Sequence, residues 1–65
     1  MRIKTAKLNN LLSIVDDLRG GVLAPSDETV VSDFQFEIES AIAERRDFDA
    51  NACIDDLEEF LRKFV

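Results

Sequence analysis

The sequence lacks histidine, tryptophan and tyrosine, and it contains only one cysteine, one proline and two glycines in 65 residues. Without histidine, the chain lacks the commonest general base and the commonest transition-metal ligand of proteins. Its single cysteine, Cys53, cannot close an internal disulfide, and its place on an apolar stripe indicates a buried structural thiol. We therefore expect no enzymatic activity, no catalytic residue, no metal ligand and no cofactor.

Long apolar runs are also missing. No stretch approaches the roughly 18 apolar residues that a membrane-spanning helix needs. The apolar segment after the charged N-terminal residues is interrupted by Asn9 and Asn10 and closed by Asp16 and Asp17, which does not fit a signal peptide. These observations predict a cytoplasmic protein with no membrane partner and with a reduced Cys53.

Positive charge is scarce, because 8 Lys and Arg face 14 Asp and Glu, giving a net charge of −6. Proteins that grip phosphate backbones do so with Lys and Arg, so nucleic acid is not an expected direct partner. The basic residues near the N-terminus, Arg2, Lys4 and Lys7, are too sparse to form a basic arm. A protein partner with a basic surface fits this charge better.

The length predicts one small helical domain over residues 1–65. A chain of this size buries only about 60% of its unfolded surface. Such domains rely on disulfides, a metal, very regular helix packing or oligomerisation. We expect helix packing that is completed by formation of a homodimer.

Two clear apolar stripes predict helices over about residues 5–19 and 50–65. The first stripe ends at Arg19, a cation in the last turn, followed by the helix stop Gly20-Gly21. The members of the two stripes recur at spacings of three and four residues; they are Leu8, Leu11, Leu12, Val15 and Leu18, and then Cys53, Ile54, Leu57, Phe60, Leu61 and Phe64.

The middle of the chain carries two patterns. Phe34, Phe36 and Ile38 alternate with polar residues as in a half-buried strand. The same segment also forms a helical stripe, which consists of Val31, Phe34, Ile38, Ala41 and Ile42. We favour a helix, because a lone strand has no partner here. It ends near residue 46 and begins either near 26, after Pro25, or near 32, with a Ser32–Gln35 capping box and a Val31–Phe36 staple. The fold class predicted is therefore all-α, a small antiparallel three-helix bundle or, alternatively, an α-hairpin pair in a dimer.

Residues 47–58 resemble an EF-hand calcium loop. The resemblance implies calcium ligands at positions 1, 3, 5, 7, 9 and 12, which here are Asp47, Asp49, Asn51, the carbonyl of Cys53, Asp55 and Glu58. Two departures count against this interpretation. Ala52 stands where the sharp turn needs Gly, and the positions that normally carry apolar residues in the exiting helix are the charged Glu59, Arg62 and Lys63.

The acidic start of a helix explains the same residues more simply. Asp49 is a suitable N-cap for a helix that begins at Ala50, and Phe48 and Cys53 would then form its hydrophobic staple. Asp55 and Asp56 are expected to face solvent in the early turns, where negative charge is favoured. A calcium-responsive protein stays an alternative hypothesis.

A continuous middle helix from residue 26 places Phe36 on the side opposite its apolar stripe. An exposed Phe among small side chains is typical of a contact site. The predicted partner-contact residues are Phe36, Ser32, Ala43, Glu39, Asp55 and Glu59. A further hypothesis is that the acidic faces of the second and third helices steer docking onto a basic partner.

These features predict a non-enzymatic protein–protein interaction module, an adaptor or inhibitor that also forms a homodimer. In type, though in no motif, such tiny acidic helical chains resemble accessory proteins of phages and plasmids. The first alternative is an acidic mimic of nucleic acid that blocks the basic groove of a DNA- or RNA-binding protein. The second alternative is the EF-hand-like calcium protein.

Overall fold

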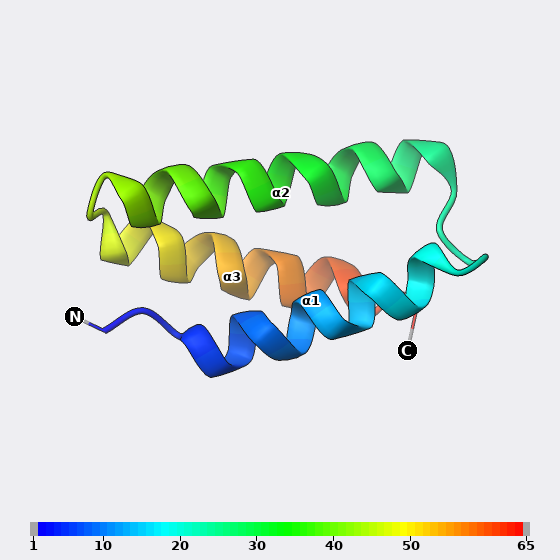
Figure 1. The fold of residues 1–65 in the computed structure, drawn as a ribbon, viewed down its shortest axis with the longest axis horizontal. Coiled ribbons are helices and arrows are strands. Elements are labelled where there is room, and N and C mark those ends of the chain that lie inside the picture. The colour runs from blue at the N-terminus through cyan, green and yellow to red at the C-terminus, as the bar shows by residue number, and fades with distance from the viewer. Residues whose placement is uncertain (1, 65) are drawn as a thin grey trace.

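The computed structural model describes residues 2–64 and contains three α-helices, α1 (Thr5–Arg19), α2 (Pro25–Ala43) and α3 (Asp47–Leu61) (Figure 1). Consecutive helices run antiparallel, and α3 lies beside both α2 and α1. The predicted all-α three-helix bundle is confirmed. The described part of the chain contains no strand, so the alternating pattern around Phe36 does not form one.

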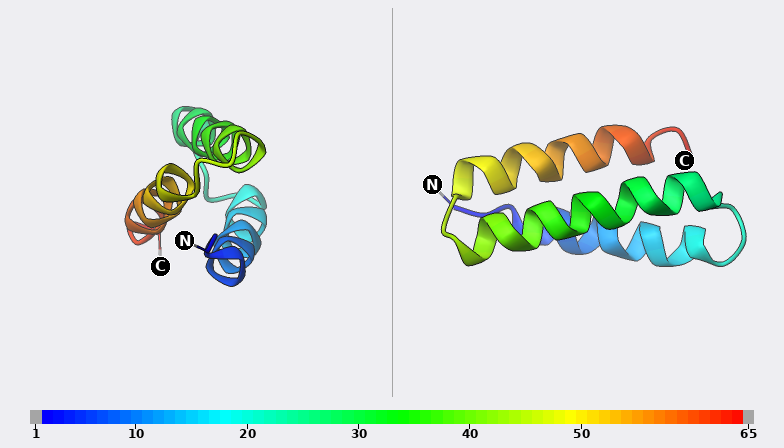
Figure 2. Two further views of the ribbon diagram at one scale, coloured as in Figure 1. Left: turned by 90° about the vertical axis from the view of Figure 1, so that its left-hand side faces the viewer. Right: turned by 90° about the horizontal axis from the view of Figure 1, so that it is seen from above.

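The core lies where the three apolar stripes meet, and α3 packs against both other helices, most extensively against α2 (Figure 2). Leu12, which belongs to the predicted first stripe, is only half-buried, whereas Ile14, which does not, packs against the core. The buried cluster contains Leu11, Val15, Leu18, Val31, Ile38, Ile54, Leu57 and Leu61. Periodicity in the sequence therefore located most of the core.

The helix α2 begins at the earlier of its two predicted starts. Pro25 occupies the first turn, where its missing N–H costs nothing, and Asp27 and Glu28 place negative charge at the helix N-terminus. The later start at residue 32 is wrong. Because Ser32 and Phe36 lie inside a helix that is already formed, neither the predicted capping box nor the Val31–Phe36 staple exists.

The helix α2 ends at Ala43, before the predicted end at residue 46, because Arg45 adopts a left-handed conformation with φ 58°. The N–H of Arg45 donates to the carbonyl of Ile42 at 3.1 Å. The N–H of Arg46 donates to the carbonyl of Ala41 at 2.8 Å. This pair of bonds is the Schellman arrangement, which usually has Gly at the left-handed position.

The end of α1 agrees with the predicted glycine stop. The carbonyl of Leu18 accepts hydrogen bonds from three successive N–H groups, those of Gly21, Val22 and Leu23. Gly21 has φ 151°, a conformation that side-chain-bearing residues rarely adopt. The chain can therefore reverse within a few residues and start α2.

The helix α3 begins at Asp47, three residues before the predicted start at Ala50. Asp49 is consequently inside the helix and is not its N-cap, and Phe48 cannot act as the residue before a cap. The predicted staple with Cys53 does not form, and the Phe48 side chain is 71% exposed. The helix ends at Leu61, before the predicted end at residue 65, and Val65 lies outside the described residues.

Within residues 2–64, none of the three helices has the length and apolar content needed to cross a membrane. The structure is that of a single chain, so the homodimer stays a prediction.

Candidate functional site

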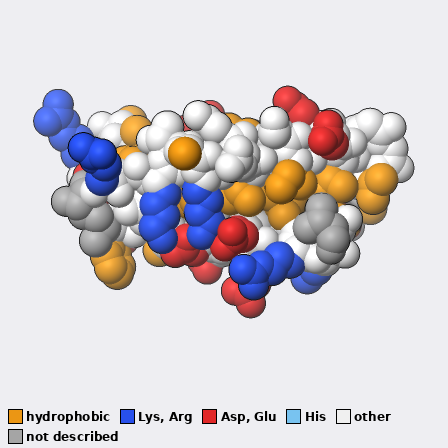
Figure 3. All heavy atoms as spheres, turned by 90° about the horizontal axis from the view of Figure 1, so that it is seen from below, with side chains coloured by type: hydrophobic (Ala, Val, Ile, Leu, Met, Phe, Trp, Pro, Cys, Tyr) orange, Lys and Arg blue, Asp and Glu red, His pale blue; other side chains and the backbone are white. Residues whose placement is uncertain are grey.

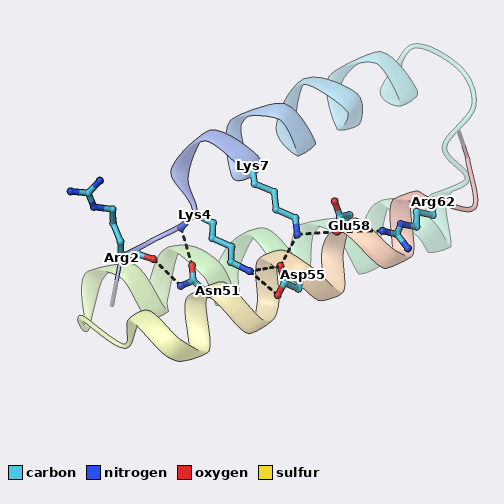
Figure 4. Close-up of polar contacts among 7 residues, drawn as sticks. All are labelled: Arg2, Lys4, Lys7, Asn51, Asp55, Glu58 and Arg62. Atoms are coloured by element: carbon cyan, nitrogen blue, oxygen red, sulfur yellow. Dashed lines mark hydrogen bonds and ion pairs between the residues drawn. The ribbon is translucent and has the colours of Figure 1, made fainter.

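A polar clasp joins the N-terminal segment to α3, and its centre is Asn51 (Figure 4). The Asn51 side chain, only 8% exposed, accepts a hydrogen bond from the N–H of Lys4 at 2.9 Å and donates one to the carbonyl of Arg2 at 2.9 Å. The two bonds join residues that are 47 and 49 positions apart in the sequence. They satisfy a buried amide that would otherwise be costly to bury.

Ion pairs extend this clasp along α1 and α3. Lys4 and Lys7 both reach Asp55, at 3.1 Å and 2.7 Å, and Lys7 also reaches Glu58 at 2.9 Å. Arg62 lies 3.7 Å from the same Glu58 carboxylate. Seen from below, cationic side chains lie directly beside acidic ones on this face of the molecule (Figure 3). Two of the three basic residues near the N-terminus, Lys4 and Lys7, are therefore already paired with acidic residues of α3.

The titration of Asp55 and Lys7 reflects these contacts. Hydrogen bonds from Lys7 and then from Lys4 lower the pKa of the Asp55 carboxyl below its ordinary value. Hydrogen bonds to Asp55 and then to Glu58 raise the pKa of Lys7 above its ordinary value. Both shifts favour the charged form of the group.

The predicted contact residues of α2 share one exposed side of that helix. The Phe36 side chain is 68% exposed, opposite the buried Val31 and Ile38. Ser32, Ala43 and Glu39 are exposed too. We call Phe36, Ser32 and Ala43 the Phe36 patch. None of these three side chains carries a charge.

The two predicted contact residues of α3 do not join this patch. Asp55 is engaged by Lys4 and Lys7 on the side of α3 that faces α1. Glu59 lies one turn beyond Asp55 on α3, is exposed and forms no ion pair with any of residues 2–64. The structure therefore separates the six predicted residues into the α2 surface and a second surface on α3.

The calcium-loop residues are not gathered around a point. Residues 47–58 lie in the continuous helix α3, which winds their side chains onto different sides of its axis. Asp55 is occupied by lysines, and Asp49 pairs with Arg46 at 3.1 Å. No group of three or more acidic or thiol side chains in the described range is placed to hold a metal ion.

A groove between α2 and α3 was not predicted from the sequence. Its lining consists of Val30, Asp33, Phe34, Glu37 and Cys53, and its volume is about 230 Å³. Val30 stands outside the apolar stripe of α2, and it is 37% exposed. The signal in the sequence was its spacing of four residues from Phe34, which places both on one flank of the helix.

Comparison with protein-family models, with curated proteins and with solved structures found no match to this chain.

Proposed function

We propose that the protein is a cytoplasmic, non-catalytic protein-interaction module, an adaptor or inhibitor that contacts its partner through the Phe36 patch. The observation that carries the proposal is the 68% exposure of the Phe36 side chain on a regular, well-packed helix. Burial of an aromatic side chain at the centre of an interface is a common source of binding energy. The small neighbours Ser32 and Ala43 would let a partner approach closely.

Self-association is part of the proposal. The centre of the Phe36 patch carries no charge, so two copies can meet there without bringing carboxylates together at the centre. A homodimer would also add apolar burial that a chain of this size has little of. Light scattering gives the mass of the particle in solution and tests this part directly.

A matched pair of variants tests the role of Phe36. Phe36→Asp and Phe48→Asp each replace a strongly exposed Phe on a helix by the same acidic residue. We expect only Phe36→Asp to abolish partner capture and to reduce the mass seen by light scattering. If both variants keep the mass and the captured partner of the unchanged protein, the Phe36 patch is not the contact surface.

A second candidate function is mimicry of nucleic acid, supported by the charge of α2. This helix carries five acidic residues and no Lys or Arg: Asp27, Glu28, Asp33, Glu37 and Glu39. Glu28 is paired with Arg19, whereas the other four form no ion pair with any of residues 2–64. Such a series of carboxylates would suit a basic groove that normally takes phosphates. Under this function, partner capture falls steeply with added salt and depends little on Phe36. If the partner binds the Phe36 patch instead, capture changes little with added salt and is lost in Phe36→Asp.

A further inference from the structure

The groove between α2 and α3 has an apolar floor that the fold leaves uncovered. Val30 and Phe34 of α2 and Cys53 of α3 form this floor. The Phe34 ring is held in place by the Phe60 ring, with 6.1 Å between the ring centres. At about 230 Å³ the groove is smaller than the ~300–1,000 Å³ of usual small-molecule pockets, a size better suited to single side chains of a partner.

The rim of the groove is acidic. Asp33 and Glu37 line it from α2, and both are exposed. Burial raises the pKa of the Cys53 thiol, and the nearby carboxylates of Glu37, Asp56 and Asp49 raise it further. The field around the thiol is therefore negative, even though Arg46 opposes it weakly.

Within residues 2–64, the carboxylates at the rim of the groove have no cationic partner. Asp33, Glu37 and Asp56 form no ion pair with any residue from 2 to 64, whereas Arg46 is engaged by Glu44 at 3.0 Å and by Asp49 at 3.1 Å. An apolar floor between unpaired carboxylates is complementary to an apolar side chain flanked by cations.

We infer that the groove binds a basic amphipathic segment of a partner protein, with one apolar side chain on Val30, Phe34 and Cys53 and with Lys or Arg beside Asp33 and Glu37. This inference rests on the proposed interaction function and adds a second surface to it. The groove lies on a different flank of α2 from the Phe36 patch. Two surfaces on one helix allow the module to hold two partners, or a partner and a second copy.

The charge favours this occupant over a second copy of the chain. The acidic rim formed by Asp33 and Glu37 would repel a second copy that brought its own acidic residues of α2 or α3 into the groove. Most of the chain's own cations are already paired internally, namely Lys4, Lys7, Arg19, Arg46 and Arg62. A basic partner segment meets no such obstacle.

The unique thiol provides a local readout of occupancy. The full chain is mixed with a synthetic amphipathic helix made of Leu, Ala and Lys, and the rate of Cys53 alkylation by iodoacetamide is followed by mass spectrometry. We expect the peptide to slow alkylation at least several-fold, because its apolar side chain covers Cys53. A peptide with Glu in place of Lys is expected to leave the rate unchanged.

Charge reversals of equal size separate the groove from general attraction. Asp33→Lys and Glu37→Lys each change the rim, whereas Glu39→Lys changes the other flank of α2, beside Leu8 and Leu12. Each rim reversal is expected to weaken peptide binding about fivefold. Glu39→Lys is expected to weaken it much less.

Three results would overturn the inference: an unchanged alkylation rate in the presence of the Lys peptide, equal protection by the Glu peptide, or equal weakening by all three reversals. The Phe36→Asp variant separates this inference from the proposed function. It is expected to bind the peptide normally while losing its partner at the Phe36 patch. Loss of Cys53 protection with Phe36-dependent capture intact would reject the groove alone.

Discussion

The helix α3 is held on its two sides by different chemistry. Towards α2 the contact is apolar and aromatic, with the Phe60 ring between those of Phe34 and Phe64, at 6.1 Å and 5.7 Å. Towards the N-terminal segment, a clasp of one amide and several ion pairs, centred on Asn51 and Asp55, borders the core. We expect the apolar side to contribute most of the folding stability, whereas the polar side fixes where the N-terminal segment lies.

A fully buried core residue of α3 gives the largest expected effect. Leu57 is fully buried, so Leu57→Ala leaves a cavity that the helices can only partly fill. We expect the free energy of unfolding to fall by about 2–5 kcal/mol, enough to unfold a marginal domain of this size. Urea denaturation followed by circular dichroism measures this change. Ala52→Ser, at an exposed position of the same helix, is the control and should change stability little.

The polar side is broken most directly at Asn51. Asn51→Ala removes both hydrogen bonds to the N-terminal segment, and we expect a loss of about 1–3 kcal/mol. The specific readout is amide hydrogen exchange, which should accelerate at the N–H of Lys4. Asn9→Ala on the exposed side of α1 is the matched control. Unchanged exchange at Lys4 in Asn51→Ala would show that the amide does not hold the segment.

The apolar side can be strengthened instead of broken. Arg45 adopts φ 58° at the end of α2, which costs a residue with a side chain roughly 1 kcal/mol and costs Gly little. We expect Arg45→Gly to raise the free energy of unfolding by about 1 kcal/mol through the connection between α2 and α3. In the same variant, hydrogen exchange at the N–H of Lys4, on the polar side, should slow only as far as the higher global stability accounts for.

A decrease in stability for Arg45→Gly would contradict this account of the turn. The reverse substitution at the other turn, Gly21→Ala, is expected to destabilise the protein, because its φ of 151° strains any residue with a side chain. Together the two variants test whether backbone conformation, and not side-chain contact, determines how much each turn contributes to stability.

The apolar side of α3 was predictable from the sequence, and the polar side was not. Leu57 and Leu61 repeat with the helical period, so their burial follows from local spacing. Asn51 stands at the border of that stripe, and its partners are 47 and 49 residues away in the chain. No local pattern distinguishes it from a solvent-facing amide or a calcium ligand. The prediction that α2 continues to residue 46 rested on helix propensity, which gives no sign of the left-handed conformation of Arg45.

The same reason explains what could be predicted of the candidate site. The exposure of Phe36 follows once α2 runs unbroken from Pro25, because helical geometry then fixes its direction. The engagement of Asp55 does not follow, since Lys4 and Lys7 meet it only after α1 and α3 have packed together. Surfaces made by one helix are readable from sequence, whereas surfaces shared by two helices need the fold.

The smallest expected effect concerns pH, and it acts only on the polar side. The pKa of Asp55 is lowered in the folded protein, so its contribution is present above the ordinary value of 3.8 and is lost as the pH falls through the lower folded value. Asp55→Asn should therefore be slightly less stable than the unchanged protein at neutral pH, and this difference should shrink in acid below 3.8. Urea titrations of both proteins across this range measure it. Asp56→Asn, on the same helix but without an ion pair to residues 2–64, is the control whose difference should not follow this pattern. A difference for Asp55→Asn that persists at the lowest pH would show that the lysine contacts do not stabilise the clasp through charge.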